Sequence, residues 1–371
     1  MPSSRSARQT SQGADVTLLK TAITLNDFIF DSSPGFTDVA DHVVAAESLG
    51  VDTIWSAEAW GADGVVPLAF MAARTSRIRL ASGILQITAR APAMTAMTAM
   101  TLDHVSGGRF VLGLGASGPQ VVEGLHGQRY DRPLERLRET VDVIRMAFSG
   151  NKISYTGNQI VLPLPGGQGK PIAIGQPARP DLPIHLATLG PKALAYTGAA
   201  ADGWVATCFV PETAAYYLDH IRAGAAAAGR SLDGFEITAG GPVALTDDLE
   251  RPMRGRRKAL AFQLSAMGSP TTNFYNDAFA RIGYEEAVHR VRDLWLAGDR
   301  DGAVAAVPDD LVLRTSLMGT DDMVGERIRA YRSAGVTSLR LEPMGRTATE
   351  KLDALARILD LIREVNTEPL P

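Results

Sequence analysis

Short apolar segments rich in β-branched residues alternate with longer segments of helical periodicity along almost the whole chain. The segment 20–26 (KTAITLN) is the first apolar run, and apolar residues then recur every three or four positions from Val39 to Leu49, directly before Gly50. This spacing predicts an amphipathic helix that ends at the glycine. The same reasoning predicts eight strands, at residues 20–26, 52–57, 77–85, 109–115, 183–188, 203–209, 235–245 and 338–343.

Helical patterns separate these strands. One of them opens with Pro92, and a proline suits the first turn of a helix because its missing N–H would have no partner there. The other expected helices lie at residues 67–74, 133–148, 191–201, 212–227, 321–334 and 350–365. Strands that alternate with helices pair in parallel, because parallel neighbours need a crossover connection. Eight such units favour a closed (β/α)₈ TIM barrel over an open doubly wound sheet.

Two insertions interrupt the alternation of strands and helices. Residues 151–182 resemble a hairpin that turns at Gly157-Asn158 and continues into a loop rich in proline and glycine, whereas residues 246–320 are long and largely helical. Loops of this length in a compact fold are usually lids or binding elements. We expect one catalytic barrel domain over residues 20–371, behind a flexible tail at residues 1–19.

Composition and charge exclude several classes of function. The net charge is −4 and the basic residues are scattered, so no basic face for nucleic acid is expected. No stretch approaches the roughly 18 consecutive apolar residues of a membrane helix, and residues 1–19 lack the apolar core of a signal peptide. Cys208 is the single cysteine, so an intramolecular disulfide is impossible. We therefore expect a soluble, cytoplasmic enzyme with neither a nucleic-acid nor a membrane partner.

Barrel enzymes react at the carboxyl ends of their strands, so ionisable residues at those positions are the first candidates for catalysis. Glu58 follows the predicted strand 52–57 and precedes Trp60, where desolvation would tune a carboxylate for proton transfer. The alternative for Glu58 is a loop residue that forms hydrogen bonds or a salt bridge. His126 follows the strand 109–115 in a loop and is a second acid–base candidate, whereas His104 is placed to cap a helix end.

Other motifs indicate a function less specifically. Pro191 starts a helix after a strand, so the free N–H groups of that first turn would suit a phosphate, with Lys192 adding charge; an ordinary turn is the alternative. Met94, Met97 and Met100 recur every third residue and are expected to fill the core. The chain has no HxH, HExxH or CxxC spacing and no GxSxG motif, so we expect neither a metal site nor a serine hydrolase.

Three segments together resemble the luciferase-like monooxygenase superfamily. They are RIRLASGILQI (77–87), SGGRFVLGLGASGPQVVEGLHG (106–127) and IHLATLGPKALAYTGAAADGW (184–204). The similarity is greatest to the branch that uses the deazaflavin coenzyme F420, which includes proteins like methylenetetrahydromethanopterin reductase. The resemblance extends over residues 21–364 and implies a (β/α)₈ barrel that binds F420 or FMN at the carboxyl ends of its strands.

The resemblance also implies the residues that would contact the cofactor. A bulge with a non-prolyl cis peptide bond would lie at Gly83–Ile84, a cofactor wall at residues 117–120, and a phosphate-binding turn at residues 188–192. The expected cofactor-binding residues are Asn26, Gly83, Ile84, Leu85, Ser117, Gly118, Gln120, Thr188, Leu189, Gly190, Pro191 and Lys192.

The chain departs from this family pattern at two strand ends. Members that use F420 often carry Asp-His where this chain has Glu58-Ala59, so either Glu58 takes over the polar role or His126 handles the proton. The end of the predicted strand 203–209 lacks the lysine of relatives that oxidise sugar phosphates, which argues against a phosphorylated sugar as substrate.

Three functions remain open at this point. The first is an F420-dependent oxidoreductase that moves a hydride between the deazaflavin and a small organic substrate, and the family resemblance implies a homodimer. The second is an FMN-dependent monooxygenase supplied with reduced flavin by a partner reductase. The third is a barrel that binds a flavin without catalysis.

Overall fold

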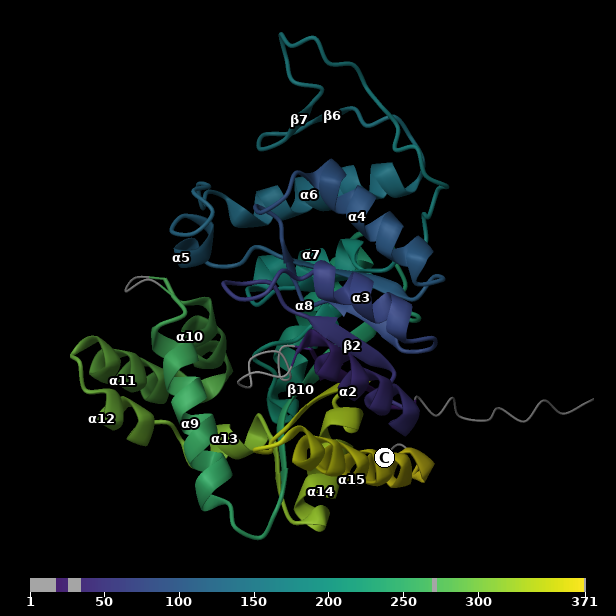
Figure 1. The fold of residues 1–371 in the computed structure, drawn as a ribbon. Coiled ribbons are helices and arrows are strands. Elements are labelled where there is room, and N and C mark those ends of the chain that lie inside the picture. Colours follow the sequence, from purple (N-terminus) through teal and green to yellow (C-terminus); the bar gives the residue numbers. More distant parts are fainter. Residues whose placement is uncertain (1–17, 26–34, 269–271, 370–371) are drawn as a thin grey trace, which may run out of the picture.

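In the computed structural model, which describes residues 18–25, 35–268 and 272–369, eight parallel strands close into a barrel (Figure 1). Around the barrel they follow the order β1-β2-β3-β5-β8-β9-β10-β12, and β12 pairs with β1 to complete the circle. The predicted (β/α)₈ barrel is therefore confirmed. The strands are β1 (Lys20–Thr24), β2 (Thr53–Ser56), β3 (Arg79–Ser82), β5 (Phe110–Gly115), β8 (Ile184–Ala187), β9 (Gly203–Val205), β10 (Glu236–Leu245) and β12 (Ser338–Pro343).

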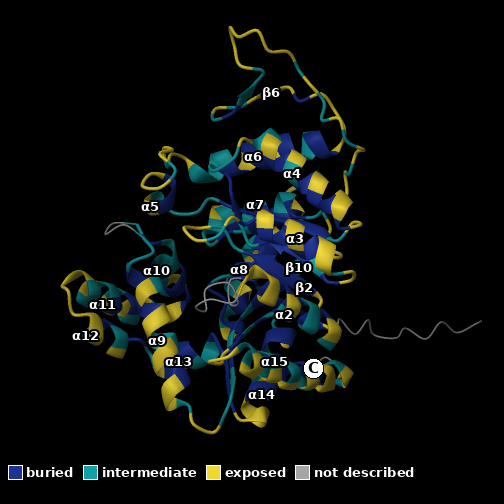
Figure 2. Ribbon diagram, viewed as in Figure 1, coloured by how far each residue is buried: buried dark blue, intermediate teal, exposed yellow. Residues whose placement is uncertain are grey.

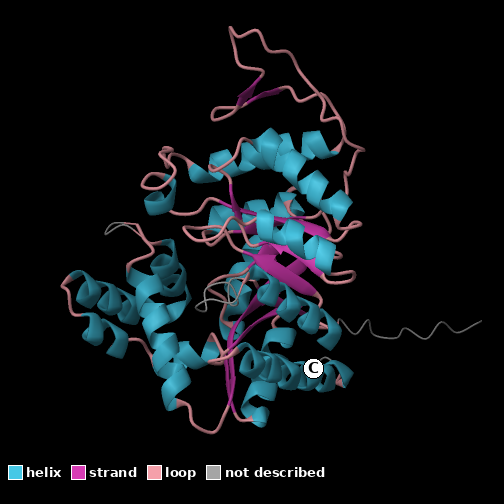
Figure 3. Cartoon of the chain, in the orientation of Figure 1, coloured by secondary structure: helices cyan, strands magenta, loops and turns pink. Residues whose placement is uncertain are grey.

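Helices surround the barrel, as Figure 3 shows, and most agree with the predicted ranges to within two residues. Prolines stand in the first turns of several of them, and Gly50 ends α2 in the left-handed conformation at φ +98°. These helices are α2 (Phe36–Leu49), α3 (Val66–Arg74), α4 (Pro92–Val105), α6 (Pro133–Phe148), α7 (Pro191–Ala200), α8 (Ala214–Ala227), α14 (Asp321–Ser333) and α15 (Ala348–Thr367). The predicted helix 212–227 is divided, because a short 3₁₀ helix η1 (Pro211–Thr213) precedes α8.

Two strands are shorter than the sequence predicts by more than two residues. The range 77–85 is interrupted after Ser82, and β4 (Leu85–Gln86) resumes the pairing with β5. The range 203–209 leaves the sheet after Val205, although Cys208 and Phe209 remain buried. Phe209 packs against the rings of Trp204, Tyr217 and Tyr331 instead. An apolar run predicts burial, but it does not distinguish burial within a sheet from burial beneath a helix.

The insertions differ from each other in form. The first contains the predicted hairpin, β6 (Tyr155–Thr156) and β7 (Val161–Leu162), which projects beyond α6 at one end of the molecule (Figure 1). The second forms a group of helices beside the barrel and ends in the short strand β11 (Leu317–Gly319), which pairs with β10 and was not predicted. Its helices are α9 (Glu250–Ser265), α10 (Phe274–Phe279), η2 (Ala280–Tyr284), α11 (Glu285–Leu296), α12 (Arg300–Ala305) and α13 (Asp309–Arg314).

Most of the buried apolar side chains lie between the strands and the surrounding helices (Figure 2). A smaller cluster fills the inside of the barrel, where Trp55 packs with four small or β-branched residues from neighbouring strands. These are Ala22, Ala81, Val111 and Val205. Alternation along each strand explains the two clusters, because successive side chains point to opposite faces of the sheet.

The methionine stripe of α4 belongs to the core only at one of its three positions, so the sequence prediction is wrong for the other two. Met100 is 2% exposed, but Met94 is 52% and Met97 43% exposed. The buried residues of α4 are Thr95, Ala96, Ala99, Met100, Leu102 and Asp103, so only one of the three methionines belongs to the inner face. A spacing of three residues turns by less than a full helical turn at each step, so the stripe runs from the inner face to the outer one.

Charged residues occupy the amino-terminal end of the barrel interior. Glu236 accepts hydrogen bonds from Lys20 at 3.1 Å and from Arg79 at 2.8 Å, and all three begin or nearly begin their strands. The Nε2 atom of His185 lies 3.7 Å from Glu236. Burial lowers the pKa of His185 to about 4 even though Glu236 acts in the opposite direction. His185 is therefore neutral at pH 7, and its contact with Glu236 is not an ion pair.

Acid should destabilise this protein partly through His185. Unfolding lets the imidazole take up a proton at its ordinary pKa near 6.5, whereas the folded state resists protonation down to about pH 4. The free energy of unfolding should therefore fall by on the order of 3 kcal/mol from this group as the pH drops through that window. Urea unfolding at several pH values should show a smaller loss in His185→Gln than in the wild type. His289→Gln, on the outer helix α11, is the control, and an unchanged pH dependence in His185→Gln would contradict the assignment.

Candidate active site

The loops that follow β2, β3, β5 and β8 lie side by side at the carboxyl-terminal mouth of the barrel. These four strands are consecutive in the sheet and parallel, so their carboxyl ends point in the same direction. The loops carry Glu58, residues 83–86, residues 117–120 and residues 188–192, which the sequence predicted as site residues or their neighbours. Asn26, the remaining predicted cofactor contact, lies outside the described residues.

The break between β3 and β4 forms a bulge directly above the barrel interior. The Gly83–Ile84 peptide bond is cis, as the family resemblance implies. A Cβ atom on Gly83 would lie 2.7 Å from Cε3 of Trp55, which is closer than a side chain can approach. Glycine at this position therefore lets the indole of Trp55 pack beneath the bulge. Leu85 is 1% exposed and belongs to the core, so its side chain supports the bulge from behind.

Two polar side chains that are not among the predicted cofactor-binding residues follow this bulge. Gln86 is 1% exposed, and its Nε2 atom donates hydrogen bonds to the backbone oxygens of Glu58 at 3.2 Å and Ala59 at 3.3 Å. Its Oε1 atom and the Oγ1 atom of Thr88 are buried without a hydrogen-bond partner among the described residues. The sequence signal that could have identified them is the presence of two polar residues, Gln86 and Thr88, in an otherwise apolar strand end. Buried polar atoms are normally hydrogen-bonded, so polar residues at such a position indicate a binding partner.

Glu58 is held in an ion-pair network. Nη1 of Arg90 donates to both carboxylate oxygens at 2.7 and 2.8 Å, and Nη2 of Arg90 donates to Asp63 at 2.8 Å. The Glu58 side chain is only 10% exposed, whereas Trp60 is 59% exposed and does not cover it with an apolar wall. These contacts correspond to the salt-bridge alternative for Glu58. They fasten the loop after β2 to the segment that follows β4.

The loop after β5 forms a wall shared with the helical insertion. Ser117 has a positive φ of 59°, and its backbone oxygen accepts a hydrogen bond from the hydroxyl of Tyr130 at 3.0 Å. A Cβ atom on Gly118 would lie 3.9 Å from the backbone oxygen of Met267, which follows α9. The rings of Tyr130 and Phe274 are 6.1 Å apart, and burial raises the pKa of Tyr130 to about 12. The insertion therefore contacts the residues predicted to bind the cofactor.

His126 lies just beyond α5 (Pro119–Val122), the short helix that contains Gln120. Its backbone N–H donates to Val121 at 3.1 Å, which places the imidazole in the turn after the helix. The Nε2 atom is buried and has no hydrogen-bond partner among the described residues. A buried imidazole nitrogen without a partner is an unsatisfied polar atom, which folded proteins normally pair.

The turn before α7 offers backbone N–H groups to a ligand. Gly190 is the N-cap residue, Pro191 is the first residue of the helix, and no side chain caps the first turn. A Cβ atom on Gly190 would meet nothing within 4 Å, so the turn is open, and Lys192 is exposed beside it. Thr188 is fixed from behind, because its hydroxyl bonds to that of Thr197 at 2.7 Å and its backbone oxygen accepts from Nε1 of Trp204 at 2.9 Å.

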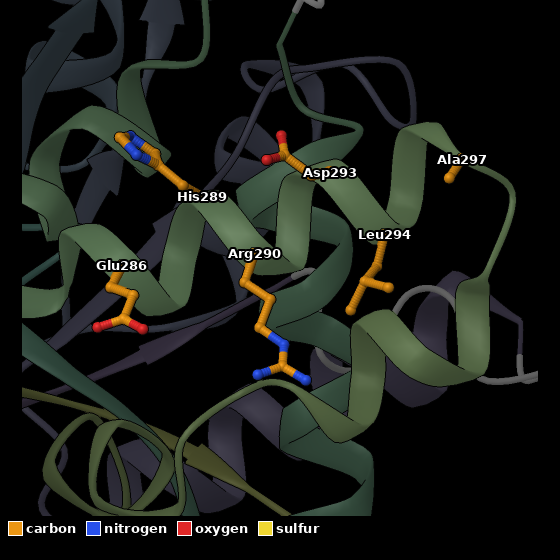
Figure 4. A pocket seen from close by; sticks show the side chains of 6 residues that line it. All are labelled: Glu286, His289, Arg290, Asp293, Leu294 and Ala297. Atoms are coloured by element: carbon orange, nitrogen blue, oxygen red, sulfur yellow. The ribbon is translucent and has the colours of Figure 1, made fainter.

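Features typical of other functions are not found in the part of the chain that the structure describes. No group of three or more His, Cys, Asp and Glu side chains there could hold a metal ion. No helix within residues 18–25, 35–268 and 272–369 has both the length and the apolar character to cross a membrane. A shallow pocket in the insertion is lined by residues of α11 and by Ala297, which follows it (Figure 4). Its lining residues are Glu286, His289, Arg290, Asp293, Leu294 and Ala297.

Comparison with known proteins gives consistent matches. The family described as luciferase-like monooxygenase matches residues 14–338. A Mycobacterium tuberculosis protein provisionally named coenzyme F420-dependent oxidoreductase is 41% identical over 81% of this chain and 89% of its own length. The 5,10-methylenetetrahydromethanopterin reductase of Archaeoglobus fulgidus is 30% identical over 80% of this chain and 87% of its own.

A solved structure confirms the architecture. The coenzyme F420-dependent tetrahydromethanopterin reductase from Methanopyrus kandleri superposes with a TM-score of 0.73 over 92% of this chain and 97% of that chain, at 23% identity. The match at this identity concerns the fold, and it agrees with the family match over most of the sequence. The chain belongs to the luciferase-like monooxygenase family.

Proposed function

We propose that the protein is an F420-dependent oxidoreductase that transfers a hydride between the deazaflavin and a small organic substrate. The observation that carries the proposal is the open, uncapped first turn of α7, two strands away from the bulge at Gly83–Ile84. The turn offers N–H groups to a phosphate, and the bulge offers a backbone surface to a ring. The names of the two relatives in the comparison, at 41% and 30% identity, support a reductase or oxidoreductase.

The residues at the mouth fit such a cofactor. Gln86 and Thr88 each keep a buried oxygen without a partner beside the bulge, and polar groups on a bound ring would satisfy them. Gly190 and Lys192 would hold the phosphate at the other end. When bound, the deazaflavin supplies the hydride acceptor or donor. The protein supplies position, and the packing of Trp55 beneath Gly83 keeps that surface in place.

We assign the handling of the proton to His126 and a positioning role to Glu58. Both oxygens of Glu58 are bound by Arg90, so the carboxylate would have to leave its ion pair before it could accept a proton. The Nε2 atom of His126 has no such competing partner. A neutral imidazole can donate from one nitrogen and accept at the other, which suits proton transfer in either direction of the reaction.

The purified protein should bind F420 with a micromolar dissociation constant and bind FMN at least about tenfold more weakly. Intrinsic tryptophan fluorescence is a suitable signal, because Trp55 packs against the bulge and Trp60 lies exposed near the mouth. Preference for FMN would instead indicate a flavin-dependent monooxygenase. Binding of neither compound would contradict the assignment of the site.

The packing of Trp55 beneath the bulge can be tested with a pair of substitutions. Gly83→Ala should weaken F420 binding by about tenfold, since the new Cβ displaces the indole and tilts the bulge. Trp55→Phe in the same protein should restore much of the affinity by making room. Gly175→Ala is the control, because a Cβ there meets nothing within 4 Å. Wild-type affinity in Gly83→Ala would show that the bulge does not shape the cofactor site.

The two candidates for the proton can be separated by steady-state kinetics, with a substrate found by screening with F420. His126→Asn should lower kcat by about 10²- to 10⁴-fold and remove one limb of the pH–rate profile, while F420 affinity stays unchanged. Glu58→Gln should mainly raise KM and leave both limbs of the pH–rate profile in place, because loss of the ion pair with Arg90 loosens the loop after β2. His220→Asn, on the outer helix α8, is the control. Loss of the limb in Glu58→Gln and not in His126→Asn would reverse the two roles.

A further inference from the structure

A second group of charged side chains lies at the ends of β10 and β12. Leu339 and Leu341 of β12 belong to the apolar core between strands and helices. Arg340 and Glu342 alternate with them and therefore point to the inside of the barrel near its carboxyl-terminal mouth. Arg256 approaches from α9 in the insertion and interacts electrostatically with both. The sequence analysis selected neither arginine.

Close backbone contacts bring Arg256 to this position. Its Nη2 atom donates to the backbone oxygen of Thr315 at 3.5 Å, the long end of the hydrogen-bonding range. The same oxygen would lie 2.5 Å from a Cβ atom on Gly241, so only glycine permits this approach. Gly241 pairs with Leu341, between Arg340 and Glu342. The hydrogen bond to Thr315 holds Arg256 beside β10. A Cβ atom on the preceding residue, Gly255, would lie 3.8 Å from Cε of Met344, the residue after β12, so this part of α9 lies beside the end of β12.

The cluster carries more positive than negative charge. Nε of Arg340 lies 3.1 Å from Oε1 of Glu342, and within the described residues no other carboxylate pairs with either arginine. Nε of Arg256 is buried without a hydrogen-bond partner there. Cys208 and Tyr275 interact electrostatically with Arg340, but burial raises the pKa of each to about 12, so both are neutral at pH 7. Two cations and one anion leave a net charge of +1.

This arrangement has the properties of an anion-binding site. The Nε atoms of Arg256 and Arg340 are buried without a hydrogen-bond partner among the described residues, and an anion that accepts from them removes the cost of that burial. A carboxylate matches the planar donors of arginine and carries the single charge that balances the cluster. Glu342 would repel the second charge of a phosphate monoester. Gly240 of β10 pairs with Arg340 and has no side chain, so it occupies no space beside Arg340 inside the barrel.

The cluster lies across the mouth from the proposed cofactor residues. The bulge belongs to β3 and β4, on the opposite side of the closed sheet from β10 and β12, and the turn before α7 follows β8, which β9 separates from β10. A ligand bound by Arg256 and Arg340 is therefore distinct from the phosphate at α7. It would share the mouth with the cofactor and face it.

We propose that the substrate is an organic monoanion whose carboxylate binds between Arg256 and Arg340, with Glu342 limiting the site to a single negative charge. The proposal rests on the proposed function, because it names the substrate class of the same site.

Isothermal titration of the F420-loaded protein with benzoate and hexanoate, each compared with its neutral amide, tests the proposal. The acids should bind at least about tenfold more tightly than the amides. Arg256→Gln should weaken binding of the acids by about 10- to 100-fold and leave the amides unchanged, since only a charged hydrogen bond is lost. Glu342→Gln should strengthen binding of the acids and admit phenyl phosphate, which the wild type excludes.

Arg257→Gln is the matched control, because Arg257 is the next residue of α9 and pairs with Asp309 instead. Equal binding of acids and amides, or an equal effect of Arg257→Gln, overturns the proposal even when F420 binds normally. A loss of F420 affinity in Arg256→Gln also overturns it, since the cluster would then hold the phosphate of the cofactor. If the wild type fails to bind F420 but the apoprotein still discriminates acids through Arg256, the proposed function fails and the anion site stands.

Discussion

The hydrogen bonds between β1 and β12 close the sheet, and the arrangement of the mouth depends on that closure. The register of β1 and β12 joins Lys20 to Ser338 and Ile23 to Leu341, so the first and last strands of the barrel are neighbours. Because all eight strands are parallel, closure gathers their carboxyl-terminal loops in one ring. Residues separated by more than two hundred positions, such as Glu58 and Glu342, thereby belong to the same mouth.

The inside of the barrel carries charge at both ends, but the two groups differ in how well they are satisfied. At the amino-terminal end, Glu236 accepts from Lys20 and Arg79, and neutral His185 adds no further charge. That group also contains two cations and one anion, but both cations donate hydrogen bonds to the one carboxylate. At the mouth, only Arg340 lies within ion-pair distance of Glu342, and the Nε atoms of Arg256 and Arg340 have no hydrogen-bond partner among the described residues. Between the two charged groups, Trp55 and its small neighbours form an apolar layer inside the barrel.

Contacts, more than residue type, separate the roles proposed for Glu58 and His126. A glutamate and a histidine at strand ends are both plausible acid–base groups by chemistry alone. In the folded chain, Arg90 occupies both oxygens of Glu58, whereas Nε2 of His126 has no partner among the described residues. The ion pair of Glu58 also links the loop after β2 to the segment behind the bulge. A residue chosen for catalysis from its position can therefore act by holding the site together.

The sequence by itself determined the eight strands, the helices between them and the positions of both insertions. Periodicity and prolines at helix starts act over a few neighbouring residues, so they can be read locally. The family pattern also indicated the bulge at Gly83–Ile84 and the turn at 188–192, which are continuous segments.

Only the tertiary structure decided which distant side chains meet. It paired Glu58 with Arg90, left Gln86 with an unsatisfied oxygen, and brought Arg256 from the insertion to Arg340 and Glu342. It also turned Met94 and Met97 outward. These outcomes depend on closure of the sheet and on the packing of an insertion against it, and neither leaves a periodic signal in the chain.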